Sequence, residues 1–320
     1  MYMSSSTVLG LGAIWAGVAQ AQTVYGLHRT YDAGNFWDEF DFFNEPDPTR
    51  GFVEYVDNAT AMAEGLAASR DGQIFMGVDT VTEFPANGRK SVRVTSRESF
   101  THGLFIADLA HVPSSACGSW PALWSFGPNW PASGEIDILE GVNTQHTNSI
   151  TLHTSPGCSI SQIDTVSSTT LANADCNTGT AFTGCSQHTA DNQNYGDGMN
   201  AIGGGVYAME WLSEHIAVWY FPRYAIPQDI LRGDPVPSTW GLATAKFYGG
   251  STCDLDAHFM NHNLVFDTTF CGDWAGAVWA DNPECSALAP TCNEYVAANP
   301  GAFVDSFWSV NSINVYKLLQ

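Results

Sequence analysis

Three carboxylates interrupt an otherwise apolar segment, residues 134–141, which reads Gly-Glu-Ile-Asp-Ile-Leu-Glu-Gly. Successive side chains of a strand point to opposite faces, so Glu135 and Asp137 would share one face. Glu140 lies five residues after Glu135, and a regular strand would turn it to the apolar face. One extra residue at Ile138 or Leu139 would form a β-bulge and return Glu140 to the acidic face. A regular helix would leave the two glutamates about 140° apart around its axis. We therefore predict a bulged strand that carries three converging acids.

Paired carboxyl groups on one face suit the cleavage of a glycosidic bond, in which one attacks or stabilises the anomeric carbon and the other protonates the leaving oxygen. With the bulge, Glu135 and Glu140 act as positions i and i+4, whose Cα atoms lie roughly 13 Å apart. Strand curvature and the two long side chains must then close the gap to the ~5 to 5.5 Å that a retaining enzyme requires. Asp137 would lie between them and influence which carboxyl keeps a proton. A solvated acidic face or a Ca²⁺ site is the alternative interpretation.

Tryptophans precede the acids at positions 120, 124 and 130. A flat indole face is a good platform for a pyranose ring, and a neutral glycan offers no charge to bind instead. The alternative is that these indoles belong to the core, because Trp is highly buried on average.

The elements around these residues look like strands, and long helical patterns are scarce. Alternating or apolar runs predict strands at 91–96, 103–112, 149–154, 207–211, 215–221, 263–266 and 312–318. Frequent glycine and proline punctuate them, which favours an antiparallel sandwich with long loops. Residues 155–205 are polar, show little periodicity and hold three cysteines, so we expect an irregular insertion stapled by disulfides, with an interdomain linker as the alternative.

The first 21 residues carry no Lys, Arg, Asp or Glu and end in Ala19-Gln20-Ala21, an A-x-A cleavage pattern. We predict a secretory signal peptide at residues 1–21 and one catalytic β-sandwich domain at 22–320, with a buried N-terminal element as the alternative. Eight cysteines follow, an even count that suggests disulfides in a secreted protein. Pairs between Cys285 and Cys292, and between Cys253 and Cys271, would close short loops. Asn58 begins the sequon Asn-Ala-Thr, a possible glycan site.

The net charge of -22, from 33 acidic and 11 basic residues, makes nucleic acid and anionic membranes poor partners. No later segment has the run of about 18 to 20 apolar residues that is needed to span a membrane. A neutral polymer stays possible as a partner.

Several motifs in order resemble glycoside hydrolase family 16, in particular the fungal laminarinase-type endo-β-1,3(4)-glucanases. They are Trp-Pro-Ala-x-Trp at 120–124, Asn-Trp-Pro at 129–131, the acidic motif continued as Gly-Val-Asn at 141–143, and the segments 151–154, 207–210, 218–223 and 270–276. The likeness extends over nearly the whole chain after residue 21. It implies an all-β fold, a curved antiparallel β-sandwich (jelly roll) whose concave face forms a glycan-binding cleft.

The resemblance also implies roles for single residues. Glu135 matches the family's nucleophile, Glu140 its acid/base and Asp137 an assisting acid between them. The substrate-binding positions that it implies are Trp124, Trp130, His153 and Trp274. For His153 the alternative is a hydrogen-bonded strand histidine without a catalytic part. Trp120 is assigned to the core and Glu210 to the structure of the sheet. The spacing E-x-D-x-x-E is typical of the laminarinase branch.

These observations predict a secreted, monomeric, retaining endo-hydrolase of β-1,3-glucan and of mixed-linkage β-1,3/1,4-glucan. No cofactor is expected; a structural Ca²⁺ is possible, although no EF-hand spacing indicates it. Two rivals use the same fold: a non-catalytic β-glucan-binding protein, which typically lacks the catalytic glutamates, and a β-glucan transglycosylase, in which a sugar replaces water as the acceptor.

Overall fold

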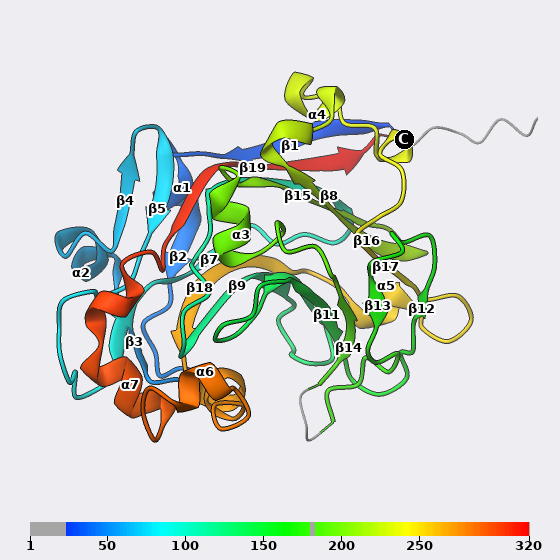
Figure 1. The fold of residues 1–320 in the computed structure, drawn as a ribbon. Coiled ribbons are helices and arrows are strands. Elements are labelled where there is room, and N and C mark those ends of the chain that lie inside the picture. Colours follow the sequence, from blue (N-terminus) through cyan, green and yellow to red (C-terminus); the bar gives the residue numbers. More distant parts are fainter. Residues whose placement is uncertain (1–23, 180–182, 320) are drawn as a thin grey trace, which may run out of the picture.

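Two antiparallel sheets stacked on each other dominate the computed structural model, which describes residues 24–179 and 183–319 (Figure 1). The covering sheet has the strand order β12 (Ser161–Gln162), β17 (Ala245–Tyr248), β16 (His215–Pro222), β15 (Gly205–Trp211), β8 (Gly103–His111), β19 (Trp308–Leu318), β5 (Gln73–Met76) and β4 (Ala67–Arg70), and β1 (Tyr25–Tyr31) also pairs with β19. The acid-bearing sheet has the order β13 (Thr170–Leu171), β14 (Cys185–His188), β11 (Ser149–His153), β10 (Glu135–Glu140), β9 (Ser119–Phe126), β18 (Asn263–Phe270), β7 (Arg93–Ser96) and β2 (Phe40–Phe42).

The remaining elements are short. β3 (Val53–Tyr55) and β6 (Arg89–Ser91) form a parallel pair. The α-helices are α1 (Phe36–Glu39), α2 (Asn58–Ala63), α3 (Gly196–Ala201), α4 (Gln228–Arg232), α5 (Leu255–His258), α6 (Pro283–Ser286) and α7 (Cys292–Ala298). Short 3₁₀ turns are η1 (Arg223–Ala225), η2 (Pro237–Thr239) and η4 (Pro300–Phe303), and η3 (Gly272–Gly276) is a single π-helical turn. Among the described residues, no helix is long and apolar enough to cross a bilayer.

The main core lies between the two sheets. Ile136 and Leu139 of β10 are fully buried there, together with Met209 of β15 and Val218 of β16. The opposite side of the acid-bearing sheet, which we call its open face, is turned away from this core. The packing therefore fixes which side chains of β10 can reach a ligand.

The predicted strands are present, with changes at their ends. Strand β18 continues to Phe270, beyond the predicted end at residue 266, and strand β19 begins at Trp308, before the predicted start at residue 312. The expected strand at 91–96 is wrong as one element, because the chain breaks at Val92: β6 pairs with β3 and β7 pairs with β18. The Ser91 hydroxyl donates to the carbonyl of Thr268 (2.6 Å) at this break.

Disulfides staple the molecule differently from the two short loops suggested by spacing. Within the described chain the pairs are Cys117–Cys285, Cys158–Cys253, Cys176–Cys185 and Cys271–Cys292. The expected pairs between Cys285 and Cys292 and between Cys253 and Cys271 are therefore wrong. Cys285 and Cys253 instead bond to cysteines 168 and 95 residues away, and Cys271 bonds to Cys292, 21 residues away at the start of α7. Tertiary packing therefore decides the pairing, and loop length does not. The segment 155–205 is stapled as predicted, and it adds β12, β13, β14 and α3 to the sheets and their connections.

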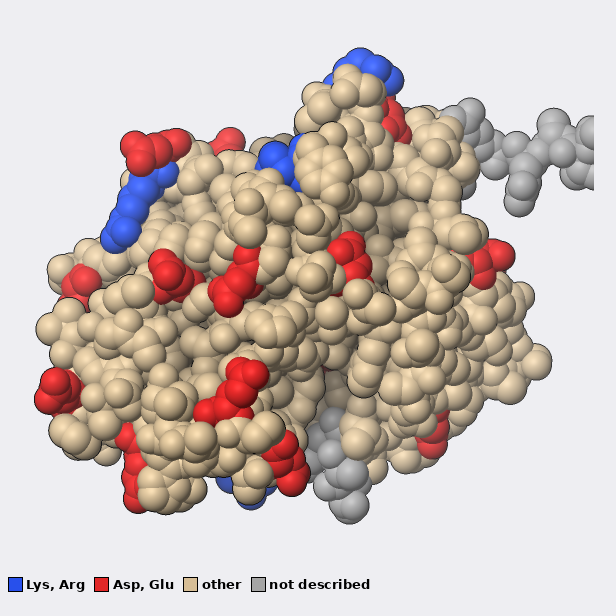
Figure 2. All heavy atoms as spheres, viewed as in Figure 1, with Lys and Arg blue, Asp and Glu red and all other residues tan. Residues whose placement is uncertain are grey.

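The surface is acidic, as the net charge of -22 requires. Figure 2 shows acidic side chains scattered over the viewed face, with basic side chains few and apart. The predicted signal peptide, residues 1–21, lies outside the described residues, and the division of the chain at residue 22 stays a prediction.

Candidate active site

The β-bulge predicted from the acidic motif is present in β10. Glu135 and Asp137 pair with Phe126 and Trp124 of β9, but the register then shifts and Glu140 pairs with Ala122. These β9 residues alternate along one face, so the extra residue at Ile138 brings all three acids to the open face of the sheet. The expectation from side-chain parity is confirmed.

A buried amide satisfies the backbone groups that the bulge releases. Asn148, which has no exposed surface, accepts a hydrogen bond from the Glu140 amide (2.8 Å) and donates one to the carbonyl of Ile138 (2.8 Å). It also donates to the hydroxyl of Tyr207 (3.1 Å), which belongs to the covering sheet. The bulge is thereby tied across the sandwich. Asn148 could not be recognised from the sequence as a support of the bulge. The one hint of it there is its place as a polar residue directly before the apolar strand β11.

Glycines at both ends of the motif allow close packing. Gly134 has a φ of +81°, and a Cβ there would lie 2.4 Å from the ring of Phe259. A Cβ on Gly141 would lie 2.7 Å from the ring of Tyr195. Both positions therefore exclude larger residues and fix where β10 enters and leaves the sheet.

Glu135 is held by Trp130 of the β9–β10 connection, whose indole N–H donates to its Oε2. Burial, together with the neighbouring carboxylate of Asp137, raises the pKa of Glu135 to about 8. The Trp130 bond and the nearby His153 oppose this shift. In the ligand-free state this carboxyl therefore keeps a proton more readily than a glutamic acid in water.

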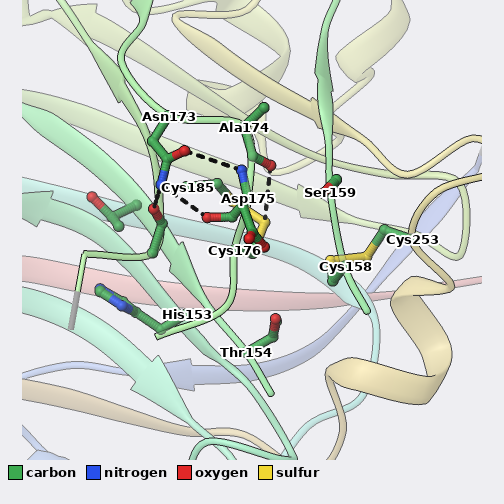
Figure 3. The surroundings of a disulfide bond; sticks show 12 residues. His153, Thr154, Cys158, Ser159, Asn173, Ala174, Asp175, Cys176, Cys185 and Cys253 are labelled. Carbon is green, nitrogen blue, oxygen red and sulfur yellow. Dashed lines mark hydrogen bonds between the residues drawn. A yellow bond between two sulfur atoms is a disulfide. The ribbon is translucent and has the colours of Figure 1, made fainter. Parts of the chain in front are cut away.

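Asp137 and His153 lie side by side on neighbouring strands. His153 Nε2 is 3.2 Å from Asp137 Oδ2 and 3.9 Å from Glu135 Oε1. Burial raises the pKa of Asp137 to about 8, and Asp267 adds to the shift. Figure 3 shows His153 next to the loop closed by the Cys176–Cys185 disulfide. A Cβ on Gly184 of this loop would lie 2.7 Å from His153 Nδ1, so the loop fixes the ring from behind.

A cation could be held by this group, since one donor atom each from Glu135, Asp137 and His153 lies within 4.8 Å of the others. The two carboxyl groups also suit acid chemistry, because Glu135 and Asp137 share their face with a third carboxyl that belongs to the same motif.

Glu140 has Trp120 as its hydrogen-bond partner. The Trp120 indole N–H donates to Glu140 Oε1 (2.8 Å) from β9. Burial and the carboxylate of Asp137 raise the pKa of Glu140 well above its ordinary value, and the Trp120 bond acts in the opposite direction. The assignment of Trp120 to the core is wrong: the side chain is half-buried and lies on the open face, because its position alternates in phase with Ala122 and Trp124.

The three tryptophans predicted to bind substrate all remain accessible. Trp130 is 43% exposed, and Trp124 and Trp274 are half-buried. Trp274 belongs to η3 and lines a cavity of about 420 Å³ together with residues of 142–145 and 281–284. Its ring meets that of Trp120 edge-to-face, with centroids 5.7 Å apart. The cavity and the acids are therefore connected through two indoles.

A buried charged pair on the same sheet was also missed from the sequence. Arg93 of β7 pairs in register with Asp267 of β18, and both are buried. The guanidinium carbon of Arg93 lies 5.0 Å from the ring centre of Trp124, and the Tyr55 hydroxyl donates to Asp267 (3.2 Å). Burial raises the pKa of Asp267 to about 7, against the effect of Arg93. Neither residue stands in the acidic motif, so only the strand pairing reveals them.

Residues 40–316 match a family model described as the XgeA-like catalytic domain of glycoside hydrolase family 16. The chain belongs to this family. The predicted family and enzyme class are thereby confirmed. An endo-1,3(4)-β-glucanase of Arthroderma benhamiae is 40% identical over 319 residues, which cover 98% of this chain and 69% of that protein. Other fungal relatives with this name, some of them labelled probable, are longer, and the chain spans between 40% and 52% of their length.

Two solved structures of family 16 share the fold with a TM-score of 0.85 and cover 92% of this chain and 100% of their own. One is an elongating β-1,3-glucosyltransferase, 40% identical. The other is laminarinase 16A from Phanerochaete chrysosporium, 36% identical, which holds 6-O-glucosyl-laminaritriose in donor and acceptor sites. These similarities confirm the jelly-roll sandwich.

Removing the amide that supports the bulge should damage stability and activity together. In Asn148→Ala the Glu140 N–H and the Ile138 carbonyl lose their partners in a buried place. We expect a loss of about 2 to 5 kcal/mol in the free energy of unfolding, measured by denaturant titration. At temperatures where the variant is folded, we expect it to lose more glucanase activity than the control variant does.

Asn311→Ala is the matched control, since Asn311 also donates to and accepts from side chains, those of Asp108 and Gln73, but in the covering sheet. A folded Asn148→Ala variant with the activity of the Asn311→Ala variant would contradict the role assigned to the amide.

The stability of the ligand-free protein should fall as pH rises. Glu135 has an ordinary pKa of 4.5 and a folded pKa of about 8, so the folded state binds the proton more tightly. Its contribution is fully present below pH ~4.5 and is lost as pH rises toward ~8. We expect the melting temperature to fall across this window, and to fall several degrees less in Glu135→Gln. The exposed Glu45→Gln is the control, and an unchanged slope in Glu135→Gln would refute the expectation.

Proposed function

We propose that this chain is a secreted, retaining endo-β-glucanase that cleaves internal bonds of β-1,3-glucan and of mixed-linkage β-1,3/1,4-glucan. The observation that carries the proposal is the bulged strand β10, which turns Glu135 and Glu140 to one open face, each with an indole N–H donor. Support comes from family membership, from the names of the fungal relatives, and from the laminarinase whose sites hold a β-glucan.

In the first step Glu135 attacks the anomeric carbon of a bound glucosyl unit. A bond forms from its carboxylate oxygen to C1 while the C1–O bond to the leaving glucan breaks. Glu140 gives its proton to that leaving oxygen and becomes a carboxylate. In the second step Glu140 takes a proton from water, the water oxygen bonds to C1, and Glu135 leaves as a carboxylate. Two inversions give net retention.

The raised pKa of Glu140 suits its role as proton donor, whereas the raised pKa of Glu135 opposes its role as nucleophile. A raised pKa keeps Glu140 protonated, as an acid must be. Glu135 must be ionised to attack, so substrate has to arrive while the protons of the acidic row are on Asp137 or Glu140 and not on Glu135. Asp137 lies between the two and is the assisting acid, because repulsion among three close carboxylates decides where the remaining protons reside.

The aromatic residues supply binding without charge. We propose that Trp124, Trp130 and Trp274 stack on glucosyl rings, and that His153 contacts the sugar near Glu135. No cofactor is required in this proposal, because the two glutamates supply the nucleophile and the proton. Secretion agrees with four disulfides in the described chain, which persist in oxidising compartments. The monomeric state stays a prediction.

Laminarin should release reducing ends with this protein, and the release should be unaffected by EDTA. Glu135→Gln and Glu140→Gln should each lower kcat by a factor of about 10² to 10⁴ or more, because they remove the nucleophile and the proton donor. Glu210→Gln is the matched control: Glu210 is a buried glutamate of the covering sheet that accepts from Tyr25 (2.8 Å). We expect it to keep its activity.

The roles of the two glutamates can be separated by azide. It should restore turnover of Glu140→Ala with a β-glycosyl azide as product, and of Glu135→Ala with the α-configured product, since only the first retains the glycosyl-enzyme step. The reverse pattern would overturn the assignment. Binding of laminarin without any release of reducing ends would favour the non-catalytic glucan-binding protein.

Transfer to a sugar is a second candidate function, favoured by the 40% identity to the elongating β-1,3-glucosyltransferase. The same Glu135 intermediate would react with a glucan hydroxyl instead of water. At high concentrations of laminari-oligosaccharides we expect hydrolysis products to dominate, with transfer products as a minority, in a mass-spectrometric analysis. Longer products that match the shorter ones mole for mole at all concentrations, with no net gain of reducing ends, would establish the transferase instead.

A further inference from the structure

Trp120 occupies a position between the two parts of the site. On one side its indole N–H donates to Glu140 Oε1 (2.8 Å), and on the other its ring meets Trp274 edge-to-face with planes 88° apart. Its backbone is fixed by pairing with Thr269 of β18. The indole thus has little freedom to turn.

An indole N–H can only donate a hydrogen bond, so the Glu140 oxygen that contacts Trp120 has to be the acceptor. The bond leaves Oε1 engaged as an acceptor, and a proton on the carboxyl group then resides on Oε2. Glu140 Oε2 becomes the oxygen free to exchange a proton with a ligand. The backbone of Glu140 is held in the same way by Asn148, so both ends of the residue are fixed.

The two indole donors of the site are not equivalent. Trp130, which donates to Glu135, is 43% exposed and stands on the connection between β9 and β10. Trp120 is half-buried within β9 and is backed by Trp274. A glucosyl unit can therefore reach the Trp130 ring from solvent, whereas Trp120 is placed to act on Glu140.

We infer that Trp120 is a positioning residue of the reaction: its N–H fixes the rotamer of Glu140, leaves Oε2 to give and take the proton, and steadies the carboxylate formed when that proton has left. The inference rests on the proposed function, in which Glu140 is the acid/base. The inference also gives Trp274 an influence on Glu140. A sugar stacked on Trp274 in the adjacent cavity would contact the ring that packs against Trp120.

Other groups that act on Glu140 must stay constant in a test. The titratable groups facing it are Asp137 and Glu135 on its own strand, His153 on β11 and Tyr195 before α3. Replacing Trp120 alters none of these side chains. A change in the titration of Glu140 in such a variant therefore reports the lost donor or a changed burial of the carboxyl group, and a variant of the same shape separates the two.

The test is the pH profile of laminarin hydrolysis by Trp120→Phe, which keeps an aromatic ring against Trp274 and removes the N–H. The basic limb of kcat/KM reports loss of the proton from Glu140. Because a donor to a carboxylate favours its ionised form, removing it should move this limb up by about 1 pH unit. We also expect kcat to fall roughly tenfold, with KM nearly unchanged.

Trp240→Phe is the matched control. Trp240 also donates its indole N–H to a carboxylate, Asp229 Oδ2 (2.7 Å), but away from the acid-bearing sheet. Its basic limb should stay at the wild-type pH. Replacement of Trp120 by 3-benzothienylalanine, which keeps the bicyclic shape and lacks the N–H, separates the donor from packing and should give the same upward shift as Trp120→Phe.

Failure of the role of Trp120 and failure of the proposed function give different results. A wild-type basic limb in the folded benzothienylalanine protein would overturn the role of Trp120, even if Trp120→Phe loses activity. If the wild-type and Trp240→Phe proteins release no reducing ends from laminarin at any pH, the proposed function itself fails.

Discussion

The site depends on the buried side-chain amide of Asn148, which stabilises the β-bulge by bonding to its backbone. A bulge frees a backbone N–H and a backbone C=O, and in the interior each would cost about 1 to 3 kcal/mol without a partner. Asn148 supplies both partners from one side chain and links them to Tyr207 in the covering sheet. A regular strand would need no such residue, but it would turn Glu140 into the core. The amide therefore decides that the third acid is on the same face as the first two.

Crowding three carboxyl groups on that face has an electrostatic consequence. Burial raises the pKa values of all three; repulsion from Asp137 adds to the shift on the two glutamates, and repulsion from Asp267 adds to that on Asp137. The indoles of Trp120 and Trp130 oppose the shift on the two glutamates and leave Asp137 without an indole donor among the described residues. The indole bonds thus favour the ionised forms of the two glutamates against the net upward shift, while Asp137 in the middle lies beside His153. This division fits two reacting groups and one assisting group.

Much of this could be predicted from the sequence, because the relevant rules are local. Side-chain parity along Glu135, Asp137 and Glu140 required a bulge, and the structure contains it. The rest depends on contacts that no local pattern reveals. Asn148 is close in sequence to the bulge, but only the fold brings its side-chain amide to the Glu140 N–H and the Ile138 carbonyl. Arg93 meets Asp267 across 174 positions of the chain (267 − 93), and the disulfides of Cys271 and Cys285 follow the packing of α6 and α7. No strand is predicted at 119–126, and without β9 there is no side-chain alternation to place Trp120 on the same face as Trp124.

Neither the fold nor the acids can decide between hydrolysis and transfer. A glucosyltransferase and a laminarinase superpose on this chain equally well, with a TM-score of 0.85 each. In the proposed mechanism both reactions would pass the glycosyl group from Glu135 to an oxygen that Glu140 deprotonates. They differ only in whether a sugar hydroxyl or water reaches C1 first. That competition is set by how long a glucan stays in the acceptor region after the first step, and so by contacts outside the acidic motif. The cavity beside Trp274 offers an aromatic face to such a glucan, whereas the amides of Asn143, Gln145 and Asn282 in its wall are bonded within the protein. Its proximity to Trp120, which holds Glu140, makes this cavity the part of the site where binding of an acceptor and activation of its hydroxyl can be linked.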